Sequence, residues 1–249
     1  MTALRIPLLA GLEETDMDTA LELGGARFIV DRVNWPDAFP YAPLCGGRIA
    51  RTEDSLIVDF HVSGLDLRVQ HLSDNQRQWE DSCCELFLQV PGDDAYFNFE
   101  INAAGKILAA RGTGRGDRVK LSDEDVAGII RVASVEGPQD HEGGIWDWRV
   151  LVLIPFELLG LDPDNLPAKL RGNIYKCGDK TAHPHFVTWN PIGTPSPDFH
   201  RPEYFGEFSL SDYALSTISF ICGTLLSAAL KRAHWLRVRT RLCSGYLIL

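Results

Sequence analysis

The sequence has fewer basic than acidic residues. Lys and Arg together number 24 against 34 Asp and Glu, which gives a net charge of -10 over 249 residues. Proteins bind nucleic-acid backbones through clustered basic side chains that release counterions. The acidic balance therefore argues against nucleic acid as a partner and favours a neutral or cationic ligand.

The six cysteines lack a metal-binding spacing. They stand at positions 45, 83, 84, 177, 222 and 243 without a CxxC pair, which argues against a zinc site. His183-Pro184-His185 does not change this, because Pro184 keeps the two imidazoles extended and on opposite sides. We expect mostly buried free thiols, with Cys83 and Cys84 on opposite faces of a strand. A disulfide of either with Cys177 stays open, and so does the redox compartment.

The sequence also lacks a secretory signal and a phosphate-binding glycine loop. Residues 1–11 contain one Arg and a short apolar run, but acidic residues follow at once. Since this does not form a secretory signal, the chain as given is expected to be cytoplasmic. The glycines of residues 112–116 lack the spacing that cradles phosphate, and no helical pattern follows them. We interpret this segment as a hairpin loop.

Long helical periodicity is absent before residue 212, whereas alternation with period two is frequent. Leu56, Val58 and Phe60 share one strand face, and Phe97, Phe99 and Ile101 share another. Only residues 155–159 suggest a helical turn, with Pro155 at its start. Further strand candidates are residues 27–30, 83–90, 106–110, 128–135, 145–154, 172–177, 186–189 and 203–210. The pattern predicts an all-β fold, an antiparallel, jelly-roll-like β-sandwich.

The last 38 residues differ in composition from the rest. Residues 212–249 carry a net charge of +4 and the remainder -14, so we place a boundary before residue 212. The expected segments are a lead-in (1–24), a β-sandwich (25–211) and an extension (212–249). Residues 213–230 carry no charge and precede a basic stretch, but they include several Ser and Thr. A membrane or interfacial anchor is one interpretation. A packed helix and a non-native extension are the alternatives.

A loop with four prolines, residues 189–206, carries Trp189, Phe199, Tyr204 and Phe205. Aromatic side chains on such a stiff segment either fold back onto the body of the protein or form a binding platform. We expect Trp189 to be in the core and Phe199 to be the candidate platform.

Several motifs together resemble carbohydrate-binding module family 9. They are Trp35-Pro36 and the segments at residues 78–87, 96–102, 173–179 and 189–206. The most specific are Trp79-Glu80-Asp81-Ser82-Cys83-Cys84-Glu85 and Pro197-Asp198-Phe199-His200-Arg201-Pro202-Glu203-Tyr204-Phe205-Gly206. The resemblance covers about residues 25–210.

This resemblance implies a β-sandwich that binds sugars without cleaving them, beside plant-polysaccharide hydrolases, with structural calcium and a ligand held between two aromatic rings. Those rings would be Trp79 and Phe199. Members of the family carry Trp at the second position, so Phe199 offers a smaller stacking surface.

The residues themselves support such a site, because a pyranose needs flat aromatic faces and polar groups at its edge. Glu85 shares a mixed strand face with Cys83 and Phe87, and carboxylates make strong hydrogen bonds to hydroxyls. The candidate polar partners are Glu85, Glu100, Asn102, Tyr175, Lys176, Asp179 and Arg201. An ordinary solvated sheet face or a loop ion pair is the alternative for several of them.

We therefore predict non-catalytic binding of a plant-type oligosaccharide or polysaccharide, such as xylan or cellulose, in support of carbohydrate catabolism. One alternative is a glycoside hydrolase that uses Glu85 and Glu100 as paired carboxylates. Another is a membrane-attached interaction domain without sugar binding.

Overall fold

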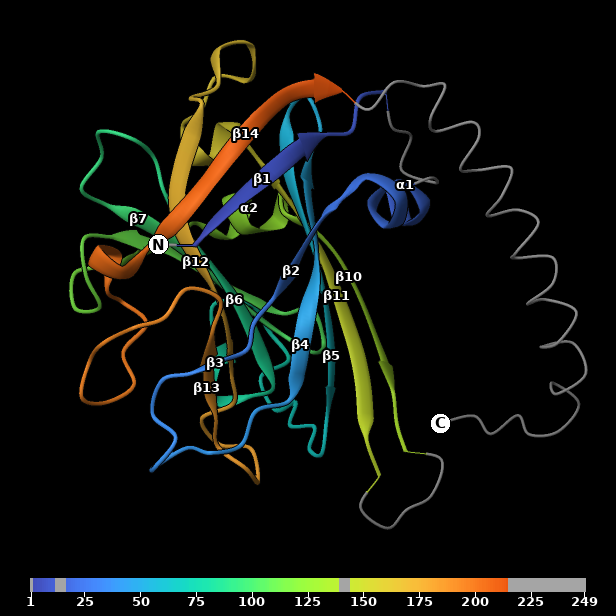
Figure 1. Cartoon of the computed structure of the whole chain (residues 1–249), viewed down its shortest axis with the longest axis vertical. Coiled ribbons are helices and arrows are strands. Elements are labelled where there is room, and N and C mark those ends of the chain that lie inside the picture. The colour runs from blue at the N-terminus through green and yellow to red at the C-terminus, as the bar shows by residue number, and fades with distance from the viewer. Residues whose placement is uncertain (1, 12–16, 139–143, 215–249) are drawn as a thin grey trace, which may run out of the picture.

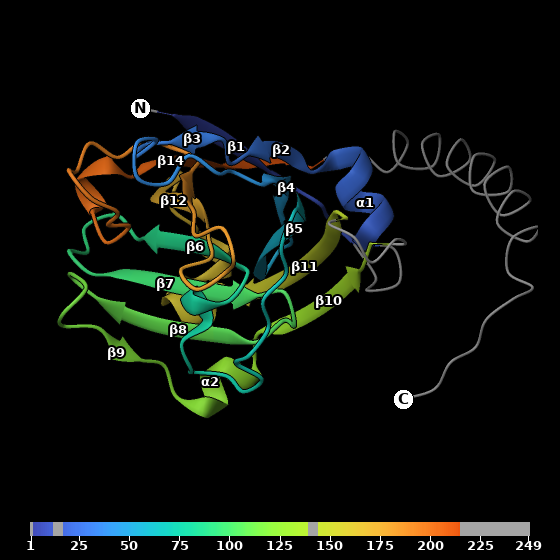
Figure 2. The same ribbon diagram turned by 90° about the horizontal axis from the view of Figure 1, so that it is seen from below.

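The computed structural model describes residues 2–11, 17–138 and 144–214. It is built on one 14-stranded sheet that curls so that its two halves face each other (Figures 1 and 2). The strands are β1 (Ala3–Leu8), β2 (Ala26–Ile29), β3 (Arg32–Val33), β4 (Leu44–Arg51), β5 (Ser55–Gly64), β6 (Cys83–Gln89), β7 (Tyr96–Asn102), β8 (Ile107–Gly112), β9 (Val119–Lys120), β10 (Ile130–Glu136), β11 (Trp146–Pro155), β12 (Lys169–Cys177), β13 (Phe186–Thr188) and β14 (Gly206–Ala214).

The helices are short. They are α1 (Met17–Gly24), α2 (Asp123–Ala127) and 3-10 turns at Gln78–Glu80, Glu157–Leu159, Pro163–Asn165 and Pro202–Tyr204. Among the helices of the described residues, none has the length and apolar character that crossing a membrane requires. The predicted anchor falls in the extension, of which residues 215–249 lie outside the described part.

The strand order shows which strands form each half of the curled sheet. It runs β10-β11-β5-β4-β1-β14-β12-β6-β7-β8-β9. The main core lies between the halves and combines Val58 and Phe60 of β5 with Leu86 of β6 and Phe99 of β7. The prediction of a β-rich sandwich is therefore confirmed, but the sheet is mixed, because β1 runs parallel to both β14 and β4.

Residues 2–11 and 17–24 form part of this fold. β1 lies beside β14 over almost its whole length (Figure 1), with Ala3 opposite Glu207. α1 buries Met17, Ala20 and Leu21 in a small cluster on the outside of the sheet. The segment that we expected to be a lead-in thus contributes a central strand and a packed helix.

β6 is buried on both faces, because the main core covers one face and a second cluster covers the other. Cys84, Leu86 and Leu88 face the main core, whereas Cys83 and Phe87 face a second cluster on the outer side. The proline-containing loop folds back over that outer side and contributes Phe199 and Phe205 to the second cluster. The opposite orientation of Cys83 and Cys84 is confirmed, and Cys45, Cys83, Cys84 and Cys177 are buried free thiols.

A buried histidine on the core side of β12 gives a testable pH dependence. His185 is 3% exposed; its Nδ1 donates to the His183 carbonyl at 2.8 Å, and its Nε2 accepts from the Lys176 ammonium at 2.8 Å. Burial, and secondarily the Lys176 charge, lower the pKa of His185 to about 3. The folded protein therefore keeps this imidazole neutral, while the unfolded chain takes up a proton below about pH 6.5.

Because the folded pKa of His185 is depressed, stability is lost as the pH falls below the unfolded value. Between pH 7 and pH 5 we expect His185 to reduce the free energy of unfolding by about 2 kcal/mol. Urea unfolding of wild type and His185→Gln at both pH values measures this as a difference between the two proteins. An equal pH dependence in both would contradict the assignment.

Candidate functional site

A small cleft lies on the outer side of β6, β7 and β12, beside the proline-containing loop. Its volume is about 180 Å³. Its walls combine aromatic, acidic and basic side chains: Trp79, Glu85, Glu100, Arg115, Arg118, Asp179, Phe186, Pro197, Asp198, Phe199 and His200. Both predicted aromatic residues, Trp79 and Phe199, therefore border the same cleft.

Trp79 stands on the 3-10 turn immediately before β6. Its indole is half-buried, and its backbone carbonyl accepts from the Asp179 amide at 3.1 Å. The next residues fix the turn: Gln78 is fully buried and donates to the Ser73 carbonyl at 2.7 Å, and Asp81 is fully buried as well. A second hollow borders the same indole on the side of His71. Trp79 is thus held by its backbone while its ring stays accessible.

Phe199 provides the other aromatic wall. Its ring stacks on the Tyr175 ring with centroids 4.1 Å apart and an interplanar angle of 5°, and it is 6% exposed. The Tyr175 hydroxyl also donates to the Phe199 carbonyl at 3.0 Å. Because Tyr175 covers one face of Phe199, only the remaining surface of the ring can meet a ligand. At Phe199 the loop folds back onto the body of the protein, where the ring packs in the second cluster and the residue borders the cleft.

Two carboxylates form the floor of the cleft. Glu85 of β6 and Glu100 of β7 are register partners, and each is 3% exposed. Burial raises the pKa of Glu100 to about 7, against the opposing effect of Arg118. Burial and the neighbouring Glu100 charge raise the pKa of Glu85 well above its ordinary value. Burial therefore favours the neutral form of Glu85, and its Oε1 accepts a hydrogen bond from the Cys177 thiol at 3.0 Å.

Glu100 has one oxygen committed and one free. Its Oε1 accepts from Asn98 at 2.9 Å and from Arg118 at 3.1 Å. Its Oε2 is buried and has no hydrogen-bond partner among the side chains and backbone of the described residues. An unsatisfied buried oxygen costs about 1–3 kcal/mol. Glu100 is also a lining residue of the cleft.

Six lining residues of the cleft were not among the predicted site residues: Arg115, Arg118, Phe186, Pro197, Asp198 and His200. Arg118 ion-pairs with Glu100 at 3.1 Å, and Arg115 ion-pairs with Asp198 at 2.9 Å. The His200 Nδ1 and the Tyr96 hydroxyl form a hydrogen bond of 2.8 Å. Both arginines come from the hairpin between β8 and β9, which the glycine-rich stretch did predict. Burial lowers the pKa of His200 to about 2, so its ring is neutral.

The comparisons with known proteins identify this architecture. The model of carbohydrate-binding family 9 matches residues 17–210. The chain belongs to carbohydrate-binding family 9. This confirms the resemblance found in the motifs, and because the family is one of non-catalytic modules, it also confirms that the chain is not an enzyme.

Two solved structures are similar to this member of family 9. One is a protein of Bacteroides uniformis ATCC 8492 for which carbohydrate binding has been suggested; it is 33% identical, with a TM-score of 0.76 over 84% of this chain and 99% of that one. The other is a family 9 module from Caldicellulosiruptor kristjanssonii in complex with glucose. It is 12% identical, with a TM-score of 0.56 over 86% of this chain and 98% of that one, and it shows the fold. No curated protein matched.

Within this family 9 module, some predicted site residues lie outside the cleft. Asn102 is fully buried and donates to the His71 carbonyl at 2.8 Å and to Asp81 at 3.0 Å. Tyr175 lies behind Phe199. Lys176 points to the opposite side of β12, where its ammonium lies 5.5 Å from the Trp148 ring centroid. None of the three lines the cleft, because strand alternation and internal hydrogen bonds commit them elsewhere.

Asp179 and Arg201 have different positions. Asp179 lines the cleft, and burial raises its pKa to about 6. Arg201 does not line it; its guanidinium ion-pairs with Asp198 at 2.7 Å. Since Asp198 is a wall residue, Arg201 acts on the cleft by positioning that carboxylate.

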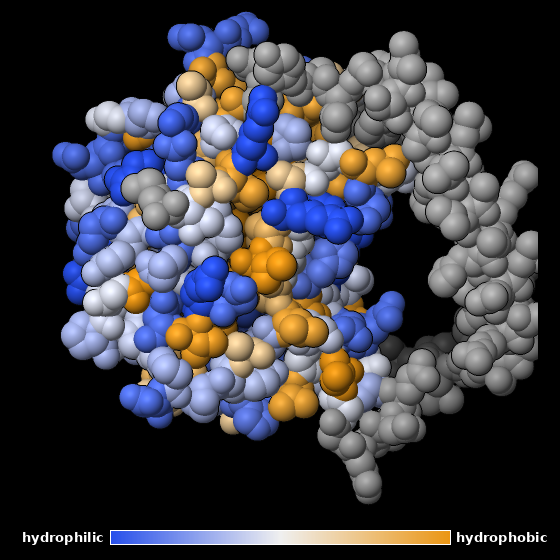
Figure 3. All heavy atoms as spheres, viewed as in Figure 1, coloured by the Kyte–Doolittle hydropathy of each residue, from blue (hydrophilic) through white to orange (hydrophobic). Residues whose placement is uncertain are grey.

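A larger hollow of about 590 Å³ lies on the outer face of β2, β4, β5, β11 and β10. Figure 3 shows hydrophobic side chains gathered over part of this region, where Ile29 and Leu44 are exposed. Of the residues lining this hollow, Trp148 is the aromatic one, and it is only 4% exposed. This hollow therefore lacks an aromatic face for stacking on a sugar ring.

Proposed function

We propose that this family 9 module binds one sugar unit of a plant-type oligosaccharide or polysaccharide between Trp79 and Phe199. Glu100 carries the proposal, because this buried acid, which has one oxygen without a hydrogen-bond partner, lines the cleft that the two aromatic residues border. Rings supply apolar contact with the C–H faces of a pyranose, and the acids and arginines bind its hydroxyls. The volume of about 180 Å³ suits a single saccharide unit.

The wider role follows from the family. A non-catalytic module of this kind would hold a glycan for a glycoside hydrolase, in support of carbohydrate catabolism. Xylan and cellulose are the proposed polymers.

Structural calcium remains a prediction from the resemblance. Calcium requires six to eight oxygen ligands. In the described ranges, the group of side chains placed to share a metal consists of two thiols and one carboxylate. That donor set does not fit calcium, and no part of the proposed sugar contact depends on the ion.

Isothermal titration with cello- and xylo-oligosaccharides tests the proposal. Wild type is expected to bind at least one of them with a Kd between micromolar and millimolar, or roughly -4 to -8 kcal/mol. At pH 8, above the pKa of Glu100, Glu100→Gln should weaken binding about tenfold, because one charge-assisted hydrogen bond is lost.

The matched control is Glu207→Gln, which removes a carboxylate of β14 that pairs with Lys169 of β12 outside the cleft. This variant should bind as wild type does. No binding to any member of the series by wild type would reject the function. Equal weakening in both variants would reject the role of Glu100.

A further inference from the structure

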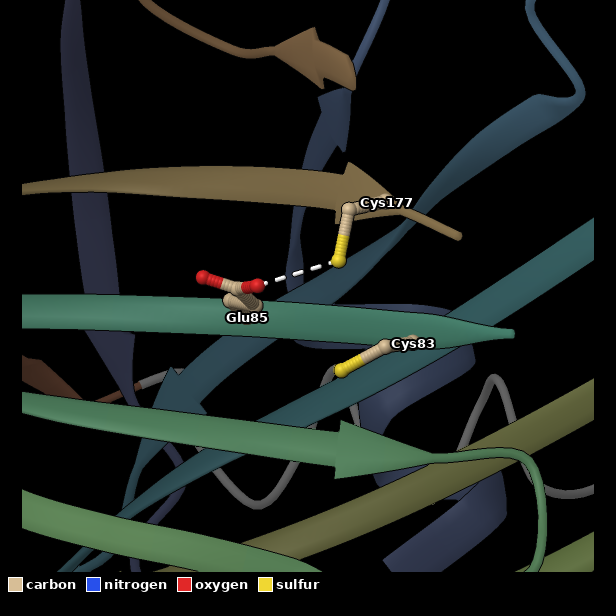
Figure 4. A group of neighbouring side chains, drawn as sticks. All are labelled: Cys83, Glu85 and Cys177. Atoms are coloured by element: carbon tan, nitrogen blue, oxygen red, sulfur yellow. Dashed lines mark hydrogen bonds between the residues drawn. The ribbon is translucent and has the colours of Figure 1, made fainter. Parts of the chain in front are cut away.

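A compact group of sulfur and oxygen ligands lies at the inner end of the cleft. Cys83 and Cys177 are register partners on β6 and β12, and Glu85 follows Cys83 on the same strand face. The two sulfurs and a Glu85 oxygen all lie within 4.8 Å of one another, and the Cys177 sulfur is 3.0 Å from Glu85 Oε1 (Figure 4). The three residues are 0%, 1% and 3% exposed. The strand register alone brings these side chains together.

We propose that Cys83, Cys177 and Glu85 bind a thiophilic divalent cation of the zinc class. Zinc takes thiolate ligands at about 2.3 Å and carboxylate oxygen at about 2.0–2.2 Å, which places its ligand atoms roughly 3.5 Å apart. The three ligand atoms, which lie within 4.8 Å of one another, would have to approach to about this distance as the ion binds. Thiolates select such ions over magnesium and calcium.

The protons and charges of this step balance. Each thiol releases a proton as the ion binds, and any proton on the Glu85 carboxyl leaves with them, so two thiolates, one carboxylate and the divalent ion give the site a net charge of -1. The positively charged Arg118 acts on Glu85 and offsets that charge. Glu85 is the member of the group that lines the cleft.

A second pair of buried cysteines provides a matched comparison. Cys45 and Cys84 have sulfurs 3.9 Å apart in the main core. The ligand group found among the described residues does not include them. If two neighbouring buried thiols were sufficient, both pairs would bind the ion.

Cobalt titration of the reduced full chain tests the proposal. With Co²⁺ alone, wild type should develop thiolate-to-cobalt absorption that saturates at one equivalent and is displaced by Zn²⁺. The absorption should be lost in Cys83→Ala/Cys177→Ala and kept in Cys45→Ala/Cys84→Ala. Both variants retain Cys222 and Cys243, so binding by those thiols appears as a residual signal. Glu85→Gln should weaken binding at least roughly tenfold, because one of three ligands is lost.

An absent absorption band in wild type, or an undiminished band in Cys83→Ala/Cys177→Ala, would overturn the proposal. Circular dichroism shows whether each variant folds. If the double variant does not fold, X-ray absorption of zinc-loaded Cys222→Ser/Cys243→Ser gives a second reading: two sulfur ligands with at least one oxygen support the site, and any other set overturns it. No sugar is present, so the result is independent of the proposed sugar binding.

Discussion

Replacing Trp79 with alanine is expected to weaken oligosaccharide binding by at least about 2 kcal/mol, or roughly 30-fold in Kd. The indole is the largest accessible ring bordering the cleft, and Phe199 on the other wall is already covered on one face by Tyr175. Phe199 cannot substitute for the lost contact, so the larger share of ring stacking falls on Trp79. Isothermal titration with the sugar that wild type binds best measures the effect.

The control for this variant is Trp146→Ala. Trp146 is a half-buried indole on β11 that packs against Gly137 and does not line the cleft. The Trp146→Ala variant should leave sugar affinity unchanged, although it removes the same amount of aromatic surface as Trp79→Ala. If Trp79→Ala bound sugar as tightly as Trp146→Ala, the two-ring arrangement would be wrong, although family membership would stand.

The acidic floor of the cleft could be anticipated from the sequence because strand periodicity fixes side-chain direction. Alternation places Cys83, Glu85 and Phe87 on one face of β6, and the structure confirms that this face is the outer one. The same rule limits the adjacent pair Tyr175 and Lys176, since neighbouring residues on a strand point to opposite sides. The sequence analysis predicted both Tyr175 and Lys176 as ligand-binding residues. The structure places Lys176 in the core, where it contacts His185.

The arginines could not be found in this way. Arg115 and Arg118 reach the cleft from a hairpin whose position depends on the pairing of β8 with β7 and β9. A loop carries no periodicity, so its sequence indicates a turn but not the residues that it will meet. Only the charge of a buried carboxylate such as Glu100, which requires a partner, could have suggested a nearby cation.

Long-range pairing also explains the missed elements of the fold. β1 pairs in parallel with β14, about 200 residues away in sequence, with Arg5 opposite Ser209. β4 contains Gly46 and Gly47, which weaken the local strand signal. A Cβ at Gly47 would lie 1.8 Å from the Asp59 carbonyl oxygen, so the close approach of β5 requires glycine there. Local propensity cannot report a requirement set by a neighbouring strand.

Asp81→Ala is expected to destabilise the protein by about 3–5 kcal/mol, because it breaks a buried ion pair and leaves several donors without an acceptor. The Asp81 side chain is fully buried and ion-pairs with Arg68. It also accepts from the amides of Gln70 and His71 at 3.0 and 2.9 Å and from the Asn102 side chain at 3.0 Å. These contacts tie the segment before Trp79 to the end of β7, so sugar affinity should fall as well.

Urea unfolding measures the change in stability, with Asp31→Ala as the control. Asp31 pairs with Arg32 at the surface, and its replacement should cost less than about 1 kcal/mol. A comparable loss in both variants would show that Asp81 is an ordinary surface-type contact and that the turn of Trp79 is held by other means.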